Sequence, residues 1–175
     1  ILDNSSLRLK RCIDDLFEIS KVESGNVQCN LVEVNLSDLL KQIHFEMSDK
    51  IEASNLTFKT SYPEKKIICL LDSQKTYRIF DNLYMNIFKY AMPYTRVYIE
   101  LKEENGFAVV SFKNVSATEI TYAPDELTER FVRNDASRNS EGSGLGLAIA
   151  KSFTELQGGR IKVLVDGDLF KVLLK

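Results

Sequence analysis

The glycine-rich stretch at Glu141–Lys151 limits the possible folds of this chain more than any other segment. It reads Glu-Gly-Ser-Gly-Leu-Gly-Leu-Ala-Ile-Ala-Lys, and its glycines allow dihedral angles and close ligand approaches that a Cβ would forbid. The apolar residues that follow indicate a helix over about 145–157, which ends at a glycine pair. Because the N–H groups at a helix N-terminus are unpaired and the helix dipole is positive there, the pattern favours a phosphate site. The alternative is a plain tight turn.

A second motif lies about sixty residues upstream, in an amphipathic helix predicted over 74–91. The apolar positions of this helix recur at helical spacing and are Phe80, Leu83, Ile87 and Tyr90. Asn82, Asn86 and Lys89 share a neighbouring stripe. Amide oxygens are suitable ligands for Mg²⁺ and a lysine ammonium suits phosphate, so the stripe predicts a site for a metal-bound polyphosphate. The alternative is a solvated helix face.

Order and spacing of these motifs resemble those of sensor histidine kinases. Residues 82–90 are similar to the N box of that family, residues 127–133 to its F box, and residues 142–151 to its G2 box. Asp135–Arg138 is similar to the ATP lid of the family. The resemblance covers nearly the whole chain and implies a catalytic ATP-binding domain, within the ATPase group that includes gyrase. Such a transferase binds Mg²⁺ and ATP in a two-component phosphorelay for signal transduction.

The resemblance also assigns roles to residues. Asn86 would coordinate Mg²⁺ with the support of Asn82, Lys89 would contact phosphate, and Tyr90 would line the nucleotide pocket. No residue is assigned a catalytic role, although Arg133 could contact the γ-phosphate from the lid; loop arginines are otherwise usually solvated. Further nucleotide contacts are expected at Asn114, Arg138, Gly142, Ser143, Gly144, Leu145, Gly146 and Leu147.

One segment departs from the family pattern. Lys113–Ile120 has neither the aspartate nor the glycines of the G1 box, Asp-x-Gly-x-Gly. Asn114 stands where the family aspartate accepts a hydrogen bond from the adenine amino group. An amide oxygen accepts this bond without charge assistance, at a loss on the order of 1 kcal/mol, so weaker nucleotide binding is expected. The competing hypothesis is a nucleotide-independent interaction module that uses helix 4–25 and the domain surface.

Residues 4–25 form a predicted helix with a wide apolar stripe, which needs a partner. The segment is similar to the second helix of the dimerisation and phosphotransfer domain of these kinases. The domains expected are therefore 1–27, a truncated dimerisation domain, and 28–175, the catalytic domain. Full-length kinases of the family are homodimers, so this helix is expected to pair there. The alternative is that the helix packs on its own domain.

His44 is the only histidine of the chain and lies in a predicted helix over 36–50. It lacks the phosphoacceptor context of the family, and we interpret it as structural or exposed. The fragment is therefore expected to bind ATP but to lack the phosphoacceptor helix of the same kinase, its first partner. A response regulator is the second expected partner. The missing initiator Met also indicates a fragment.

The fold class predicted is α/β, an α+β two-layer sandwich. A mixed, largely antiparallel sheet is expected to be covered on one face by about three helices and preceded by a lone N-terminal helix. Hairpins are predicted around Asn105-Gly106 and Asp166-Gly167, and further strands over 56–60 and 67–71. The 67–71 strand is so apolar that a central position is expected.

Composition narrows the function further. With a net charge of −2 and 44% hydrophobic residues, the chain gives no electrostatic case for binding nucleic acid or an anionic membrane. Its three cysteines have no metal-binding spacing and are expected to be reduced thiols. No apolar run approaches the length of a membrane span, so we expect a cytoplasmic domain whose membrane segments lie elsewhere in the parent protein.

Overall fold

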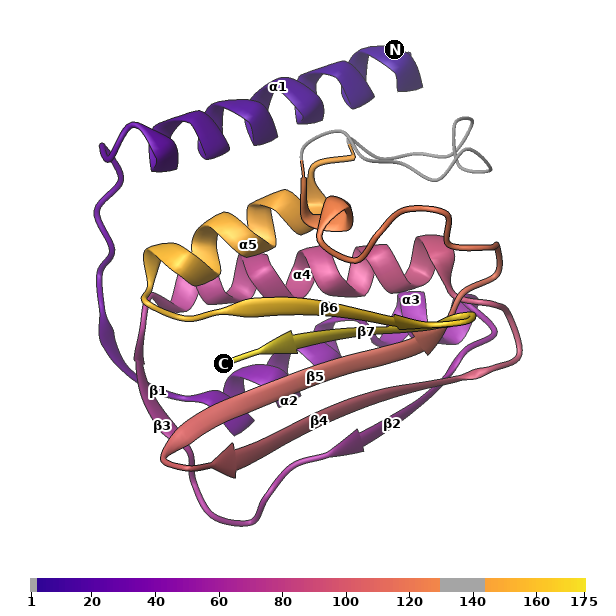
Figure 1. The fold of residues 1–175 in the computed structure, drawn as a ribbon. Coiled ribbons are helices and arrows are strands. Elements are labelled where there is room, and N and C mark those ends of the chain that lie inside the picture. Colours follow the sequence, from indigo (N-terminus) through magenta and orange to yellow (C-terminus); the bar gives the residue numbers. More distant parts are fainter. Residues whose placement is uncertain (1–2, 130–143) are drawn as a thin grey trace.

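A five-stranded sheet with one helix-covered face organises the molecule (Figure 1). The computed structural model describes residues 3–129 and 144–175. The strands, in the spatial order β2-β4-β5-β7-β6, are β2 (Thr57–Ser61), β4 (Arg96–Glu104), β5 (Phe107–Val115), β7 (Leu169–Leu174) and β6 (Ile161–Asp166). β2 pairs with β4 in parallel, and the other pairings are antiparallel. The predicted mixed, largely antiparallel sheet is confirmed.

Both predicted hairpins form, because their turn residues adopt positive φ angles. Asn105 and Gly106, with φ of 52° and 78°, connect β4 to β5. Gly167, with φ of 58°, lies in the turn between β6 and β7. These angles match the twist of the flanking strands, so each turn fixes the register of its hairpin.

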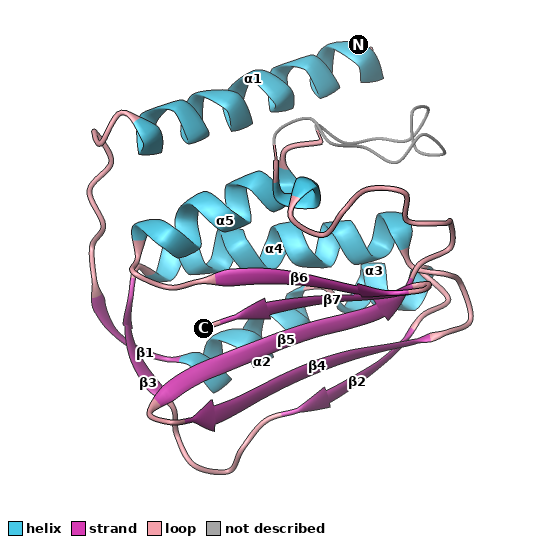
Figure 2. Ribbon diagram, in the orientation of Figure 1, coloured by secondary structure: helices cyan, strands magenta, loops and turns pink. Residues whose placement is uncertain are grey.

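The helix layer lies on one side of this sheet (Figure 2). It consists of α2 (Leu36–Glu46), α3 (Ser48–Ala53), α4 (Ser73–Tyr90) and α5 (Gly146–Leu156). The single helix predicted over 36–50 is wrong in detail, because α2 and α3 are separate helices that meet at Met47. A short 3₁₀ turn, η1 (Glu126–Thr128), lies between β5 and α5 in the chain. None of the described helices is long and apolar enough to cross a bilayer.

The strand expected to be central lies outside the main sheet. β3 (Ile68–Leu71) pairs in antiparallel with β1 (Val32–Asn35), a strand that the sequence analysis missed, and together they form a separate two-stranded sheet. Ile68 and Leu70 are 51% and 64% exposed, and Cys69 and Leu71 contact the core. The prediction failed because an apolar run does not show whether both faces of a strand are covered.

Helix α1 (Asn4–Glu23) packs along α5 through Ile19, which is only 2% exposed. The guanidinium of Arg78 on α4 holds α1 through ion pairs of 2.7 Å to Asp15 and 3.2 Å to Glu18. Several large apolar side chains of α1 still face solvent, namely Leu7, Leu9, Ile13, Leu16 and Phe17. The helix therefore contacts its own domain, as one alternative expected, and still exposes several apolar side chains.

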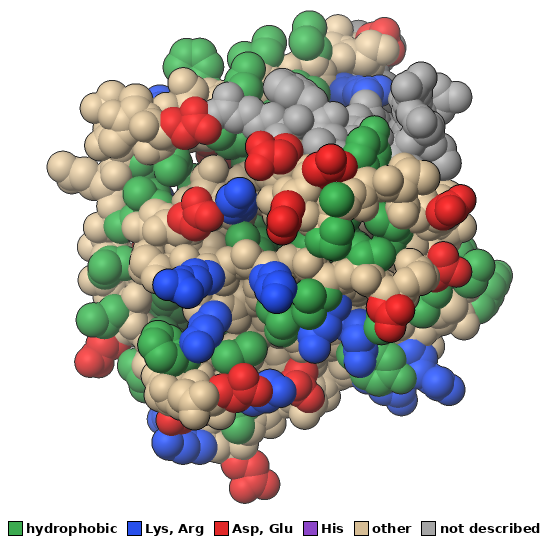
Figure 3. Space-filling view, viewed as in Figure 1, with side chains coloured by type: hydrophobic (Ala, Val, Ile, Leu, Met, Phe, Trp, Pro, Cys, Tyr) green, Lys and Arg blue, Asp and Glu red, His purple; other side chains and the backbone are tan. Residues whose placement is uncertain are grey.

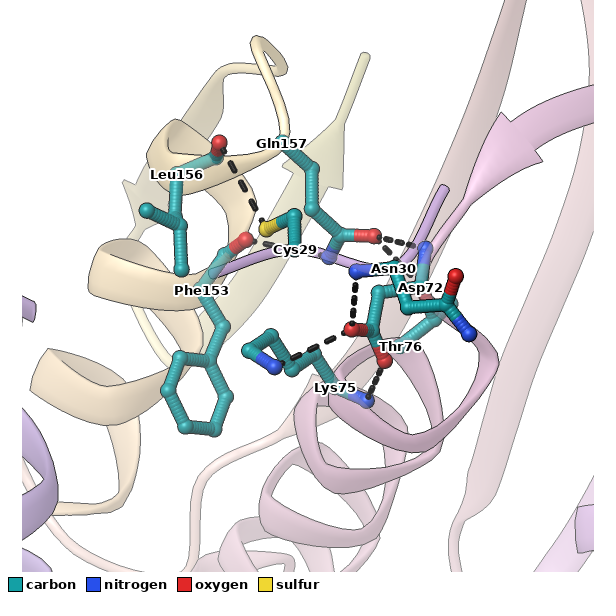
Figure 4. A network of polar contacts seen from close by, with 8 residues as sticks. All are labelled: Cys29, Asn30, Asp72, Lys75, Thr76, Phe153, Leu156 and Gln157. Carbon is teal, nitrogen blue, oxygen red and sulfur yellow. Dashed lines mark hydrogen bonds and ion pairs between the residues drawn. The ribbon is translucent and has the colours of Figure 1, made fainter. Parts of the chain in front are cut away.

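Asp72 caps the N-terminus of α4 (Figure 4). Its carboxylate accepts hydrogen bonds from the backbone N–H groups of Lys75 and Asn30, each at 3.0 Å. It also forms an ion pair of 3.0 Å with the Lys75 ammonium. Burial alone would raise the pKa of Asp72, but these hydrogen bonds and the lysine charge outweigh it and lower the pKa. The cap thereby fixes the segment between α1 and β1 against the start of α4.

Gln157 joins this cap to the C-terminal end of α5 (Figure 4). Its Oε1 accepts hydrogen bonds from the backbone N–H of Asp72 at 2.8 Å and from the Thr76 hydroxyl at 3.2 Å. Its Nε2 donates to the Phe153 carbonyl at 3.0 Å. The C-terminus of α5 is therefore bound to the N-terminus of α4, so the two helices run antiparallel.

Replacing Asp72 with Ala should lower the free energy of unfolding by about 1–2 kcal/mol, because the cap of α4 is lost. Asp72→Asn should cost less, since its amide oxygen can still accept the Lys75 N–H. Urea unfolding followed by circular dichroism measures both variants. Equal losses in the two would show that the capping hydrogen bond is not what stabilises this end of α4.

A buried aromatic cluster surrounds His44, as its expected structural role requires. Its Nδ1 lies 2.8 Å from the Tyr84 hydroxyl, and its ring centroid lies 5.8 Å from that of Phe58. Burial lowers the pKa of His44 from its ordinary value of 6.5.

This shift predicts a pH dependence of stability. Because the folded state favours neutral imidazole, the unfolded chain binds the proton more readily, and unfolding becomes easier as the pH falls below 6.5. His44→Gln should remove this contribution. Urea unfolding between about pH 7.5 and about pH 5 measures the slope in both proteins. An unchanged slope in the variant would assign the pH dependence to other groups.

Candidate functional site

The two motifs found in the sequence meet where the N-terminus of α5 lies against the second half of α4. A Cβ built on Gly146 would lie 3.4 Å from the Oδ1 of Asn82. Gln157 joins the opposite ends of the same helices. The antiparallel packing therefore places the glycine loop beside the amide stripe, as the sequence analysis requires but could not show.

The start of α5 is shaped to leave backbone donors available. Gly144 has a φ of 75°, a backbone conformation that residues with a side chain rarely adopt. Leu145, the N-cap residue of the helix, is fully buried. The first helical bond is donated by the Ile149 N–H to the Leu145 carbonyl at 2.8 Å. The N–H groups of Gly146 and Leu147 precede that bond and add to the positive end of the helix dipole.

The polar stripe of α4 faces this helix terminus. Asn82 donates its Nδ2 to the Arg78 carbonyl at 2.8 Å, which directs its Oδ1 toward Gly146. Asn86, one turn later, is half-buried, and its amide forms no hydrogen bond with any other described residue. The Lys89 Nζ lies 4.9 Å from the centroid of the Tyr90 ring. The stripe thus offers amide oxygens and an ammonium along one line.

The segment that follows β5 is bound to the end of α4. The Tyr90 carbonyl accepts from the Ala117 N–H at 2.8 Å, and the Val115 carbonyl accepts from the Met92 N–H at 2.8 Å. Asn114 is 3% exposed and donates its Nδ2 to the Val115 carbonyl at 3.2 Å. Asn114 is therefore a buried amide close in sequence to the segment that contacts Tyr90. Ile120 packs against the core.

Four of the predicted site residues, Arg133, Arg138, Gly142 and Ser143, lie outside the described residues. The others divide into three groups. The first group, on α4, is Asn82, Asn86, Lys89 and Tyr90. The second is Gly144 and Leu145, which directly precede α5, with Gly146 and Leu147, its first two residues. The third is Asn114 on β5. The structure brings α4 and α5 together directly, through Gly146.

The sequence analysis missed the groove beside Asn82. It lies between α1 and α4, has a volume of about 770 Å³, and is lined by Arg78, Asp81 and Asn82 among others. Burial raises the pKa of Asp81, against the opposing charges of Arg78 and Lys50. The sequence contained one signal for this groove. Arg78, Asn82 and Asn86 are spaced four residues apart, which places Arg78 on the same stripe of α4 as the two asparagines.

These groups fit a magnesium-bound polyphosphate. Amide oxygens are hard ligands, and Mg²⁺ usually takes only one or two protein ligands beside phosphate oxygens and water. The N-terminus of α5 supplies backbone N–H donors for phosphate, and a side chain at position 146 would contact Asn82. Donor chemistry and geometry therefore agree with a nucleotide site.

Comparisons with known proteins identify the family of the chain. Residues 71–174, more than half of the chain, match the model of the histidine kinase-, DNA gyrase B- and HSP90-like ATPase family. The chain is 31% identical over 156 residues to the sensor protein VanSC of Enterococcus gallinarum, with 88% of this chain and 43% of that protein covered. It therefore spans less than half the length of this relative.

Solved structures share the fold. Full-length ShkA in complex with AMPPNP superposes with a TM-score of 0.80 at 21% identity, covering 97% of this chain and 36% of that one. The histidine kinase ThkA in complex with the response regulator TrrA superposes with a TM-score of 0.71 at 19% identity, covering 98% and 48%. The chain belongs to the histidine kinase-, DNA gyrase B- and HSP90-like ATPase family, and it carries the catalytic ATP-binding domain of a sensor histidine kinase.

Proposed function

We propose that this chain binds Mg²⁺ and ATP between α4 and α5 and donates the γ-phosphate to a histidine outside these 175 residues. The phosphoryl group would then pass to a response regulator, the kind of partner present in the ThkA structure. The observation that carries the proposal is the contact of Gly146 with Asn82, which sets the N-terminus of α5 against the polar stripe of α4.

Each element has a distinct task in this proposal. Asn86 would hold the metal with the support of Asn82, Lys89 would bind a phosphate oxygen, and the N–H groups of Gly146 and Leu147 would bind the phosphate chain. Bound Mg²⁺ would neutralise phosphate charge. Because phosphoryl transfer depends mainly on positioning and electrostatics, no nucleophile of this chain is needed.

The adenine would lie on the side of Tyr90 and Asn114. Asn114 is buried, and its Nδ2 already donates to a carbonyl, so its Oδ1 is the atom suited to accept from the adenine amino group. Arg133 and Arg138, with Gly142 and Ser143, are proposed phosphate contacts on the resemblance alone, since they lie outside the described residues.

His44 is unsuited to accept the phosphoryl group. Its imidazole is half-buried, its Nδ1 is hydrogen-bonded to Tyr84, and its ring lies beside Phe58, a set of contacts that fits a structural role. The acceptor is therefore assigned to another segment of the same kinase. Residues 1–27 are proposed to belong to its dimerisation domain and residues 28–175 to its catalytic domain, and the exposed apolar stripe of α1 supports pairing in a homodimer. We place this domain in the cytoplasm, as the response regulator requires.

Asn86→Ala should weaken binding of a non-hydrolysable ATP analogue by about tenfold or more in the presence of Mg²⁺, because a metal ligand is lost. Removing Mg²⁺ with EDTA should weaken binding to the parent protein and leave the variant nearly unchanged. Calorimetric titration measures both.

Gln42→Ala is the matched control, since it removes an exposed helix amide that belongs to α2 and not to α4 or α5. Unchanged affinity in Asn86→Ala would overturn the assignment of Asn86. Failure of the parent protein to bind millimolar nucleotide would favour the competing hypothesis, a nucleotide-independent interaction module.

Asn114→Asp should strengthen ATP binding several-fold, because a carboxylate accepts the adenine N–H with charge assistance. GTP carries a carbonyl at the corresponding position, so its affinity should not rise. Titration of both nucleotides against both proteins gives the comparison. An equal change for ATP and GTP would place Asn114 away from the base.

A further inference from the structure

The face of the sheet turned away from the helices carries a row of lysines. By strand register, Lys59 of β2 lies beside Tyr98 of β4, Tyr98 is opposite Lys113 of β5, and Lys113 is opposite Lys171 of β7. Lys162 of β6 and Arg96 of β4 lie on the same face. We call these five cations, Lys59, Arg96, Lys113, Lys162 and Lys171, the basic face. Figure 3 shows Lys and Arg side chains gathered over the strands.

The basic face is only partly neutralised from within the described chain: Glu104 has its pKa lowered mainly by Lys102, and further by the charges of Lys175 and Lys171. None of its five cations forms an ion pair with a described carboxylate. The acidic groups on this face are Glu100 and Glu104, both paired with Lys102, and Asp166 at one end of β6. The face is therefore strongly positive, although the chain as a whole has a net charge of −2.

The opposed lysines carry an energetic cost. Lys113 and Lys171 are direct cross-strand neighbours, and both side chains are half-buried. Like charges directly opposite one another destabilise a sheet. An anionic partner bound to both ammonium groups would offset the repulsion between them. If the face were only solvated, the repulsion would have no compensating function.

The aromatic side chains of this face indicate which anion fits. The Lys113 Nζ covers the Tyr98 ring at 5.0 Å, and the Lys175 Nζ covers the Phe107 ring at 4.4 Å. Stacking of nucleic acid bases needs open aromatic faces, and an ammonium already covers one face of each of these two rings. Membrane-surface binding typically uses the protruding apolar side chains of an amphipathic helix, whereas this face is built from strands and its Leu164 is opposite Lys171.

We propose that the basic face docks a protein partner through a carboxylate-rich surface. The lysines supply electrostatic steering and register, and the aliphatic side chains between them supply contact area. This surface lies on the opposite side of the sheet from α4 and α5, so it goes beyond the nucleotide site.

The test uses fluorescent poly-L-glutamate of about 20 residues as the probe, at about 50 mM salt where screening is modest. Fluorescence anisotropy should show binding that weakens as salt is raised. The double variant Lys113→Glu, Lys171→Glu should lose about tenfold or more in affinity. Lys10→Glu, Lys41→Glu is the matched control, because it changes the net charge equally on exposed positions of α1 and α2. Its affinity should fall far less.

Three outcomes would overturn the proposal. The first is no binding of poly-L-glutamate, and the second is an equal loss in both double variants. The third is tighter binding of oligothymidine or of phosphatidylserine vesicles than of poly-L-glutamate through the same lysines, which would assign another class of partner.

Lys113→Gln, Lys171→Gln keeps the test valid if the glutamate variant does not fold. It should bind poly-L-glutamate more weakly than the parent protein and unfold at a higher temperature, since the repulsion between the two cations is removed. Unchanged affinity in this folded variant would also overturn the proposal.

Discussion

The antiparallel packing of α4 against α5 is the constraint on which the candidate nucleotide site depends. One end of the helix pair is fixed by Gln157, whose amide oxygen bridges Asp72 and Thr76. At the other end Gly146 of α5 lies next to Asn82 of α4, since a Cβ at position 146 would be 3.4 Å from the Asn82 Oδ1. Two helices bound in this way form a rigid frame, and rigid frames position binding groups more precisely than loops do.

Short-range signals in the sequence predicted much of this fold. The turns at Asn105-Gly106 and Gly167 need positive φ, which Asn and Gly adopt readily. These residue types therefore predict hairpins from local sequence alone. Helical periodicity located α4 and α5 to within a residue or two. The candidate site residues on α4 and α5 were predicted in the same way, because spacing along one helix determines which side chains share a face.

Longer-range features could not be read from the sequence. The apolar run of β3 predicted a central strand, but β3 pairs with β1 alone and exposes Leu70. Nothing in the sequence distinguishes Gln157 from the other polar residues, because its partner Asp72 lies 85 residues earlier in the chain. The basic face likewise depends on strand register across β4, β5 and β7. The net charge of the chain does not show that these lysines are grouped on one face.

Arg78 performs two separable tasks through different atoms. Its guanidinium binds Asp15 and Glu18 of α1, and its backbone carbonyl accepts the amide of Asn82. The carbonyl is fixed by the α4 backbone and stays in place whether or not the ion pairs exist. Movement of α1 away from the domain therefore leaves Asn82 oriented as before. The orientation of Asn82, on the proposed metal side of the site, therefore does not depend on the ion pairs that hold α1.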